Sequence, residues 1–174
     1  MEKYIVFDIE TTGLRPWYGD VITCICARTS EGIEFNALIH EEFRENQIEQ
    51  ERNLISKFLI WLSDKKDFCL ISKNGKEFDV PFIMARSVIL NVDYDLGFLV
   101  SLKHFDIQDV TERRISLQEM ATLLGCTPKL GKGMDAIKLY EKGEFDSLLA
   151  YCKQDVLTTE EVYKRLPEGL KVLK

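Results

Sequence analysis

The sequence predicts an α/β fold in which a mixed sheet of about five strands carries helices on its faces. Three observations support this prediction: the first forty residues hold three strand-like runs, a helical period begins at residue 46, and helix signals dominate after residue 107. The expected order is βββαβαβ followed by helices. A length of 174 residues fits one domain, which we expect to span residues 1–174.

The three expected N-terminal strands differ in their patterns. Residues 3–9 carry a continuous apolar run, which is typical of a strand that is buried on both faces. Residues 21–28 are rich in β-branched residues, and residues 32–39 alternate apolar with polar residues. The short segment Ser30-Glu31-Gly32 separates the last two runs and therefore predicts a hairpin.

Helices and short strands alternate in the middle of the chain. Residues 46–62 place apolar side chains at helical spacing, and residues 68–72 form a short apolar run. Asn74-Gly75 ends that run, and Pro81 suits the first turn of the helix that follows. Residues 104–107 predict one more short strand.

Helix signals dominate the C-terminal third. Ser116 and Glu119 match a capping box, and Gly125 suits the end of that helix. A segment rich in lysine and glycine then leads to a short helix that ends near Gly143. The last helix is expected over residues 146–166, where Pro167 ends it.

Composition limits the classes of function. Hydrophobic residues make up 45% and charged residues 30%, as in globular domains, and no apolar stretch approaches the roughly 20 residues of a membrane helix. We see no signal peptide, so we expect a cytoplasmic protein without a membrane partner. The five cysteines are odd in number and lack CxxC spacing, which favours reduced thiols over a disulfide framework or a zinc site. The net charge of −6 argues against a polyanionic partner unless several carboxylates gather around metal ions.

A first acidic motif follows the first expected strand. Side chains alternate along a strand, so Asp8 and Glu10 point to the same side. Two neighbouring carboxylates repel each other, and a divalent cation offsets that repulsion. Oxygen ligands favour a hard ion such as Mg²⁺ or Mn²⁺. Taken alone, the motif is more typical of an acidic strand end that faces water.

Two further motifs carry acidic residues, and each has an ordinary structural alternative. Asp79, in the stretch from Asn74 through Phe78, stands near a helix start, where Asp is a common N-cap residue. Tyr151 and Asp155 are four residues apart and therefore share one face of the last helix. They lie beside the apolar stripe of that helix, so we expect them to face the sheet.

Together, the three motifs resemble those of the DEDD family of 3′–5′ exonucleases, in the ribonuclease H-like superfamily. The resemblance is to the tyrosine-bearing, DnaQ-like group of that family. The DxE strand corresponds to Asp8 and Glu10, the NxxxFD stretch to residues 74–79, and YxxxD to residues 151–155. The motifs occur in the family order, and the resemblance covers residues 4–163.

The resemblance implies a catalytic role for five residues. Asp8, Glu10, Asp79 and Asp155 would hold two divalent metal ions, Mg²⁺ or Mn²⁺, with Asp8 bridging them. Glu10 and Asp155 would complete the site that activates water, and Asp79 would support the second ion. Tyr151 would orient the attacking water through a hydrogen bond.

Substrate contacts are expected around the first two motifs. Thr11, Thr12 and Gly13 offer hydroxyls and a tight turn beside Glu10. Leu14 and Trp17 follow in a loop, where the family uses apolar groups to stack on terminal bases, and core packing is the alternative for Trp17. Asn74 and Phe78 complete the expected substrate-binding set. Lysines near the second and third motifs are either phosphate contacts or ordinary solvated side chains: Lys73, Lys76, Lys129, Lys132, Lys138 and Lys142.

These expectations combine into one functional hypothesis. The protein is expected to be a metal-dependent 3′–5′ exonuclease that removes 5′-mononucleotides from the 3′ end of single-stranded nucleic acid, DNA rather than RNA. An RNA-trimming enzyme is the first alternative, and a non-catalytic nucleic-acid-binding module on the same fold is the second. The surface that binds the substrate would belong to the domain itself, to a homo-oligomer, or to a complex with a replication or repair protein.

Overall fold

The computed structural model describes residues 3–40, 46–111, 113–128, 131 and 133–171. Within them, a five-stranded mixed sheet has the strand order β3-β2-β1-β4-β5. β1 pairs antiparallel with β2, as does β2 with β3, whereas β4 runs parallel to both β1 and β5. The strands are β1 (Tyr4–Thr11), β2 (Ile22–Thr29), β3 (Glu34–Leu38), β4 (Cys69–Ser72) and β5 (His104–Asp106). The predicted fold class is confirmed.

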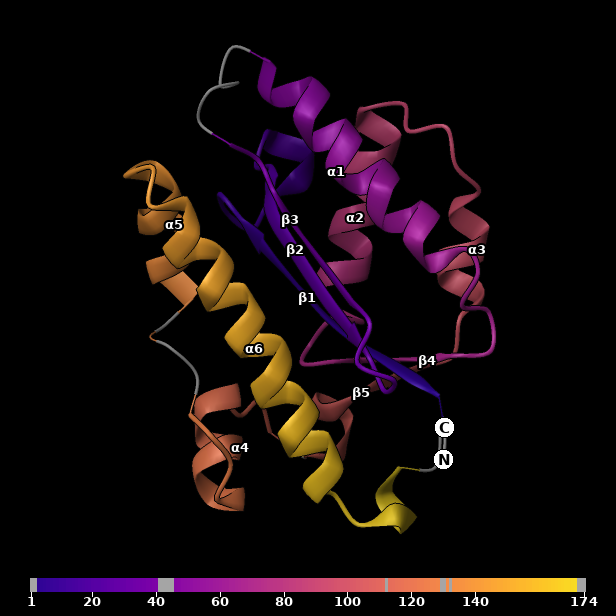
Figure 1. Ribbon diagram of the computed structural model, residues 1–174, viewed down its shortest axis with the longest axis vertical. Coiled ribbons are helices and arrows are strands. Elements are labelled where there is room, and N and C mark those ends of the chain that lie inside the picture. Colours follow the sequence, from indigo (N-terminus) through magenta and orange to yellow (C-terminus); the bar gives the residue numbers. More distant parts are fainter. Residues whose placement is uncertain (1–2, 41–45, 112, 129–130, 132, 172–174) are drawn as a thin grey trace.

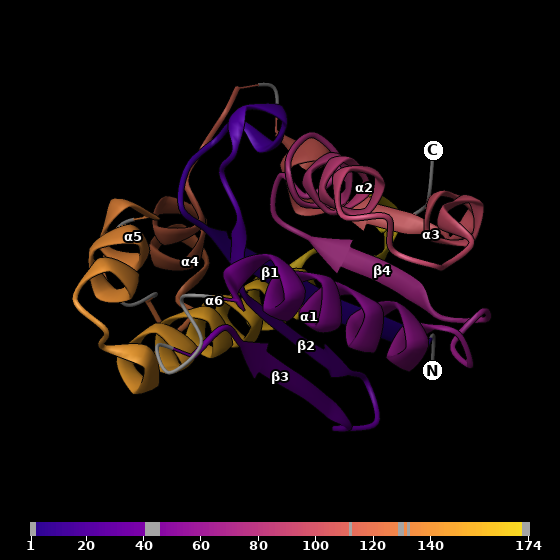
Figure 2. The same cartoon turned by 90° about the horizontal axis from the view of Figure 1, so that it is seen from above.

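Helices cover both faces of this sheet. The long helix α6 crosses one face, and α1 and α2 lie on the other (Figure 1). Seen from above, α4 and α5 gather beside α6, and α2 and α3 lie on the opposite side of the molecule (Figure 2). The α-helices are α1 (Gln47–Leu62), α2 (Asp79–Ile89), α3 (Leu96–Ser101), α4 (Leu117–Leu124), α5 (Gly133–Glu141) and α6 (Phe145–Arg165). In the described part of the chain, no helix is long and apolar enough to span a membrane.

β1 is the central strand of the core. Ile5, Val6 and Phe7 are each at most 2% exposed, because α6 packs on one face of the strand and helices α1 and α2 close the other. The prediction of a strand buried on both faces is therefore confirmed. The pairing register between β1 and β2 shifts between Glu10 and Thr11, where the chain turns away from the sheet.

The ends of α4 match the signals in the sequence. A second helix, α3, was not predicted. Ser116 and Glu119 form the predicted capping box of α4, and Gly125 ends that helix with a left-handed φ of 64°. The six-residue helix α3 was not predicted, because its short apolar run has no helical period. Its N-cap is Asp95, whose carboxylate accepts a 2.9 Å hydrogen bond from the N–H of Gly97.

A buried ion pair joins the helices that lie on the α1 side of the sheet. Arg86 of α2 donates two hydrogen bonds, of 2.8 and 2.6 Å, to the carboxylate of Glu51 in α1. Glu51 Oε1 also accepts the N–H of Ile22 in β2, and a third nitrogen of Arg86 donates to the carbonyl of Pro16. The pair therefore fixes α1, α2, β2 and the loop after β1 relative to one another.

Candidate active site

Asp8 and Glu10 lie on the face of β1 that α6 covers. Their ligand oxygens and the Cys152 sulfur of α6 all lie within 4.8 Å of one another. Asp8 is half-buried and Glu10 is 8% exposed. The two carboxylates share one side of the strand, as the alternation of side chains predicted.

A hydrogen bond to Asp79 connects the second motif to the strand that carries the first. Its Oδ1 accepts a 3.1 Å hydrogen bond from the N–H of Ile9, the residue between Asp8 and Glu10. The N-cap of α2 is Phe78, with no side-chain cap, so the alternative of Asp79 as an N-cap residue is wrong. Burial raises the pKa of the Asp79 carboxyl to about 7, because desolvation disfavours its charged form.

The loop before Asp79 is held by a buried carboxylate from β5. Asp106 accepts the N–H groups of Asn74, at 2.7 Å, and of Lys76, at 3.0 Å. At Gly75 there is no room for a side chain, since a Cβ atom would lie 2.6 Å from Ser72 Oγ and 3.2 Å from Asp79 Oδ2. Asp106 therefore positions Asp79 indirectly. The sequence offered only the Phe105-Asp106 pair as a signal of this role.

Tyr151 and Asp155 lie on α6 and face inward, as predicted. Their exposed fractions are 3% and 5%, and the Tyr151 hydroxyl has almost no solvent-accessible surface. Cys152, between them in the sequence, places its sulfur 3.6 Å from the carbonyl oxygen of Asp8. The third motif therefore packs against the strand that carries the first.

The predicted carboxylates differ in how closely they gather. Asp8 and Glu10 lie close together, whereas among the described residues neither Asp79 nor Asp155 joins those two in a group as tight as 4.8 Å. Carboxylate oxygens of this kind suit a hard divalent cation. The raised pKa of Asp79 fits the same requirement, because a nearby cation would offset the cost of its buried charge.

The two threonines after Glu10 hold the loop together. The Thr11 hydroxyl donates a 2.6 Å hydrogen bond to the carbonyl of Gly13, and the Thr12 hydroxyl accepts the N–H of Val21 at 3.0 Å. A Cβ atom at Gly13 would lie 2.4 Å from the Asp20 carboxylate, so a side chain there would displace that carboxylate from its hydrogen bond with the N–H of Arg15. Contact of these residues with a substrate stays a prediction.

Leu14 and Trp17 form an exposed apolar rim on this loop. Leu14 is 77% exposed and Trp17 is 65% exposed. The alternative of core packing for Trp17 is therefore wrong. A role in stacking on bases stays a prediction.

A cavity of about 840 Å³ joins three of the predicted substrate contacts. Leu14, Asn74 and Phe78 all line it, together with Arg113 and Arg114, which the sequence analysis did not select. The only sequence signal for the arginines is their adjacency, far from any of the three motifs. They supply positive charge to a cavity that Glu77 and Asp109 also line.

The candidate lysines fall into three pairs: one engaged near the second motif, one that lines a second cavity, and one outside the described residues. Lys73 donates to Gln108, and Lys76 forms a 2.8 Å ion pair with Asp109. Lys138 and Lys142 line a second cavity, of about 380 Å³, whose wall includes Tyr151. Lys129 and Lys132 lie outside the described residues.

Comparisons with known proteins bear on the family and the fold. A family model described as RNase_H superfamily matches residues 5–167. A DNA polymerase of Desulfurococcus sp. (strain Tok) is 26% identical over an alignment of 141 residues that covers 67% of this chain. A solved family B DNA polymerase from the archaeon Pyrobaculum calidifontis superimposes on 98% of this chain with a TM-score of 0.69 and 20% identity. The chain spans 18% and 24% of the lengths of these two polymerases.

Proposed function

The chain belongs to the RNase_H superfamily, and from this premise we propose that it is a metal-dependent 3′–5′ exonuclease of the DEDD family. It removes 5′-mononucleotides from the 3′ end of single-stranded nucleic acid, and it prefers DNA to RNA. The observation that carries the proposal is the hydrogen bond from Ile9 to Asp79, which joins the first and second acidic motifs. The preference for DNA rests on the family resemblance and on relatives that are DNA polymerases.

Asp8, Glu10, Asp79 and Asp155 are the residues that would hold two divalent ions, Mg²⁺ or Mn²⁺. When bound, such ions stabilise the charge that develops on the phosphoryl oxygens and lower the pKa of a water molecule. They also bring the net charge of −6 to −2, which answers the charge argument against a polyanionic substrate.

The remaining residues bind and orient the substrate. A phenol with a pKa near 10 stays protonated at neutral pH, so the Tyr151 hydroxyl is able to donate or accept a hydrogen bond. That hydrogen bond aligns the attacking water. Leu14, which lines the cavity, and Trp17, exposed on the same loop, contact the terminal bases, and Arg113 and Arg114 contact phosphates.

A product ladder tests this function. Single strands of DNA and RNA, labelled at the 5′ or the 3′ end, are incubated with the protein in Mg²⁺, Mn²⁺ or EDTA. We expect stepwise shortening of the 5′-labelled DNA, immediate release of labelled mononucleotide from the 3′-labelled DNA, and slower cutting of RNA. EDTA should stop all hydrolysis.

Each departure from this pattern removes one part of the proposal. Faster cutting of RNA would reassign the substrate, and a ladder from the 3′-labelled strand would reverse the polarity. Efficient cutting of closed circles would exclude an exonuclease, and hydrolysis in EDTA would exclude the metal requirement. Binding without hydrolysis in either metal would point to a non-catalytic module.

A further inference from the structure

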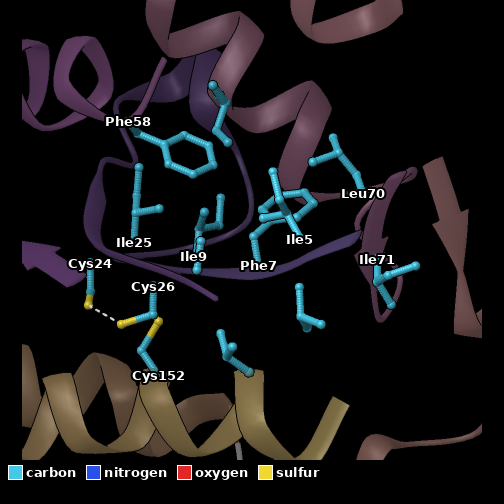
Figure 3. Packing of buried hydrophobic residues seen from close by; sticks show 14 of the residues in the cluster. Ile5, Phe7, Ile9, Cys24, Ile25, Cys26, Phe58, Leu70, Ile71 and Cys152 are labelled. Atoms are coloured by element: carbon cyan, nitrogen blue, oxygen red, sulfur yellow. Dashed lines mark hydrogen bonds between the residues drawn. The ribbon is translucent and has the colours of Figure 1, made fainter. Parts of the chain in front are cut away.

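Three thiols converge between the sheet and α6, directly behind the carboxylates of the candidate active site. They belong to Cys24 and Cys26 of β2 and to Cys152 of α6, and each residue is 0% exposed. Their sulfur atoms all lie within 4.8 Å of one another, and Figure 3 shows the three sulfurs beside one another next to α6. None of the five cysteines, all of which lie in the described part of the chain, forms a disulfide.

The sheet register explains why this group, here called the thiol trio, lies where it does. In the antiparallel ladder, Cys26 pairs with Asp8 and Cys24 pairs with Glu10. Residues directly opposite each other in such a ladder point to the same face. Each carboxylate of the first motif therefore has a thiol as its cross-strand neighbour, and α6 adds Cys152 from above.

The sulfur spacing suits a bound ion. Zn–S bonds of about 2.3 Å in a tetrahedral site place two sulfurs about 3.8 Å apart. The Cys24 and Cys26 sulfurs are 3.9 Å apart, which is far longer than a disulfide bond of about 2.05 Å. The spacing of this pair is therefore already that of two ligands on one ion.

A candidate fourth ligand lies beside the trio. Asp8 Oδ2 lies 3.9 Å from the Cys152 sulfur, and Asp8 is the half-buried member of the acidic motif. Cys152 belongs to two groups at once, one with the other thiols and one with Asp8 and Glu10. An ion that reaches the carboxylates is therefore next to the trio.

We propose that Cys24, Cys26 and Cys152 form a site for a thiophilic cation of the zinc class, with Asp8 as its fourth ligand. Soft sulfur ligands select such ions over Mg²⁺, whereas the neighbouring oxygens select Mg²⁺. Binding replaces up to three thiol protons with one ion, and those protons are released to water. The site shares Asp8 with the carboxylate metal site but has its own thiol ligands, and it does not rest on the proposed function. The alternative role for the trio is to pack the core as small apolar groups.

Cd²⁺ titration of the reduced, metal-free full chain tests the site. Thiolate ligands give a charge-transfer absorption band with Cd²⁺ that carboxylates do not, so the band separates the two sites. We expect saturation of the band at one equivalent of Cd²⁺, and loss of the band in Cys26→Ala and in Cys24→Ala. Cys69→Ala is the matched control, because Cys69 is also buried, at 3% exposure, but lies outside the trio.

Circular dichroism spectra test whether each variant is folded. In a folded variant, loss of the absorption band then means loss of Cd²⁺ binding by the thiols. If a Cys26→Ala chain does not fold, Cys26→Ser and Cys24→Ser replace the alanine variants. Absence of the band in the wild type with excess Cd²⁺ would overturn the proposal, as would an equal band in folded Cys26 and Cys24 variants. Asp8→Asn should keep the band and weaken Cd²⁺ binding by ~10-fold or more. An unchanged affinity in that variant would remove Asp8 from the ligand set.

Discussion

Two buried carboxylates, Glu51 and Asp79, lie in opposite electrostatic surroundings. Glu51 is 0% exposed and receives two hydrogen bonds from the guanidinium of Arg86. Asp79 is 4% exposed, its described hydrogen bond comes from the backbone N–H of Ile9, and its pKa is raised to about 7. The charge of Glu51 is balanced within the fold, whereas burial and the neighbouring Asp106 disfavour the charge of Asp79.

This difference separates a structural group from a functional one. A buried ion pair that loses one partner destabilises the fold, because the remaining charge has no compensation. Carboxylates that repel one another contribute little to folding stability. Binding of a cation from solution would relieve that repulsion. Variants of the two groups should therefore change different properties, and the predictions below test that separation.

The largest expected effect is the loss of hydrolysis in Asp8→Asn. Removal of the charge that holds the ions should cost several kcal/mol of transition-state stabilisation, or at least ~1000-fold in kcat. The fold should persist, and the melting temperature of the metal-free protein should stay equal or rise because one repulsive charge is gone. Steady-state kinetics and thermal melts measure both quantities.

Asp64→Asn provides a control for this variant, because the Asp64 side chain is 78% exposed and outside the cluster. Its turnover should match that of the wild type. Normal turnover in purified Asp8→Asn would contradict the assignment of Asp8.

The next effect is on stability and concerns the ion pair. Arg86→Met leaves Glu51 buried without its cation and should lower the free energy of unfolding by about 3–5 kcal/mol. Urea unfolding measures this loss, and Arg52→Met, at a 40% exposed arginine side chain, is the matched control. A loss no larger than that of the control would show that the pair is not what fixes α1 and α2.

Sequence patterns predicted most of the fold but only part of these two regions. Strand and helix positions followed from local periodicity, and Asp8, Glu10, Asp79, Tyr151 and Asp155 followed from motifs. Glu51 and Arg86 lie 35 positions apart in two helices, and no local pattern links them. No local pattern links Arg113 to the cavity that it lines, or Asp106 to the loop before Asp79. Such pairings depend on how elements pack, which a single sequence does not display.

A third effect follows from the raised pKa of Asp79. The folded-state pKa of about 7 exceeds the ordinary value of 3.8, so the protonated form stabilises the metal-free protein. That contribution is fully present below about pH 4 and is lost as the pH rises through about 7. In EDTA, the free energy of unfolding of the wild type should therefore fall across this range relative to Asp79→Asn.

Mg²⁺ sharpens the same experiment. An ion favours the charged carboxylate, so added Mg²⁺ should stabilise the wild type more at pH 8 than at pH 5. Parallel pH profiles for wild type and Asp79→Asn in EDTA would show that the carboxyl of Asp79 is not strained.

The smallest expected effect comes from Tyr151→Phe. The substitution keeps the buried ring, so the melting temperature should barely change, while kcat should fall by ~10- to 1000-fold through loss of one positioned hydrogen-bonding group. Substrate Kd, measured in Ca²⁺, should stay within a few-fold. Tyr140→Phe, at another buried tyrosine, should leave kcat unchanged. An unchanged kcat in Tyr151→Phe would show that Tyr151 only packs in the core and that its hydroxyl has no catalytic role.

The candidate site joins the first strand of the fold to its last long helix. Asp8 and Glu10 belong to β1, whereas Tyr151 and Asp155 belong to α6. On a translating ribosome, β1 emerges long before α6, because chains grow and fold from the N-terminus. A nascent chain therefore carries an incomplete set of acidic ligands until α6 has emerged and packed on the sheet. The order of synthesis thus delays completion of the proposed nuclease site until α6 has been made and has packed on the sheet.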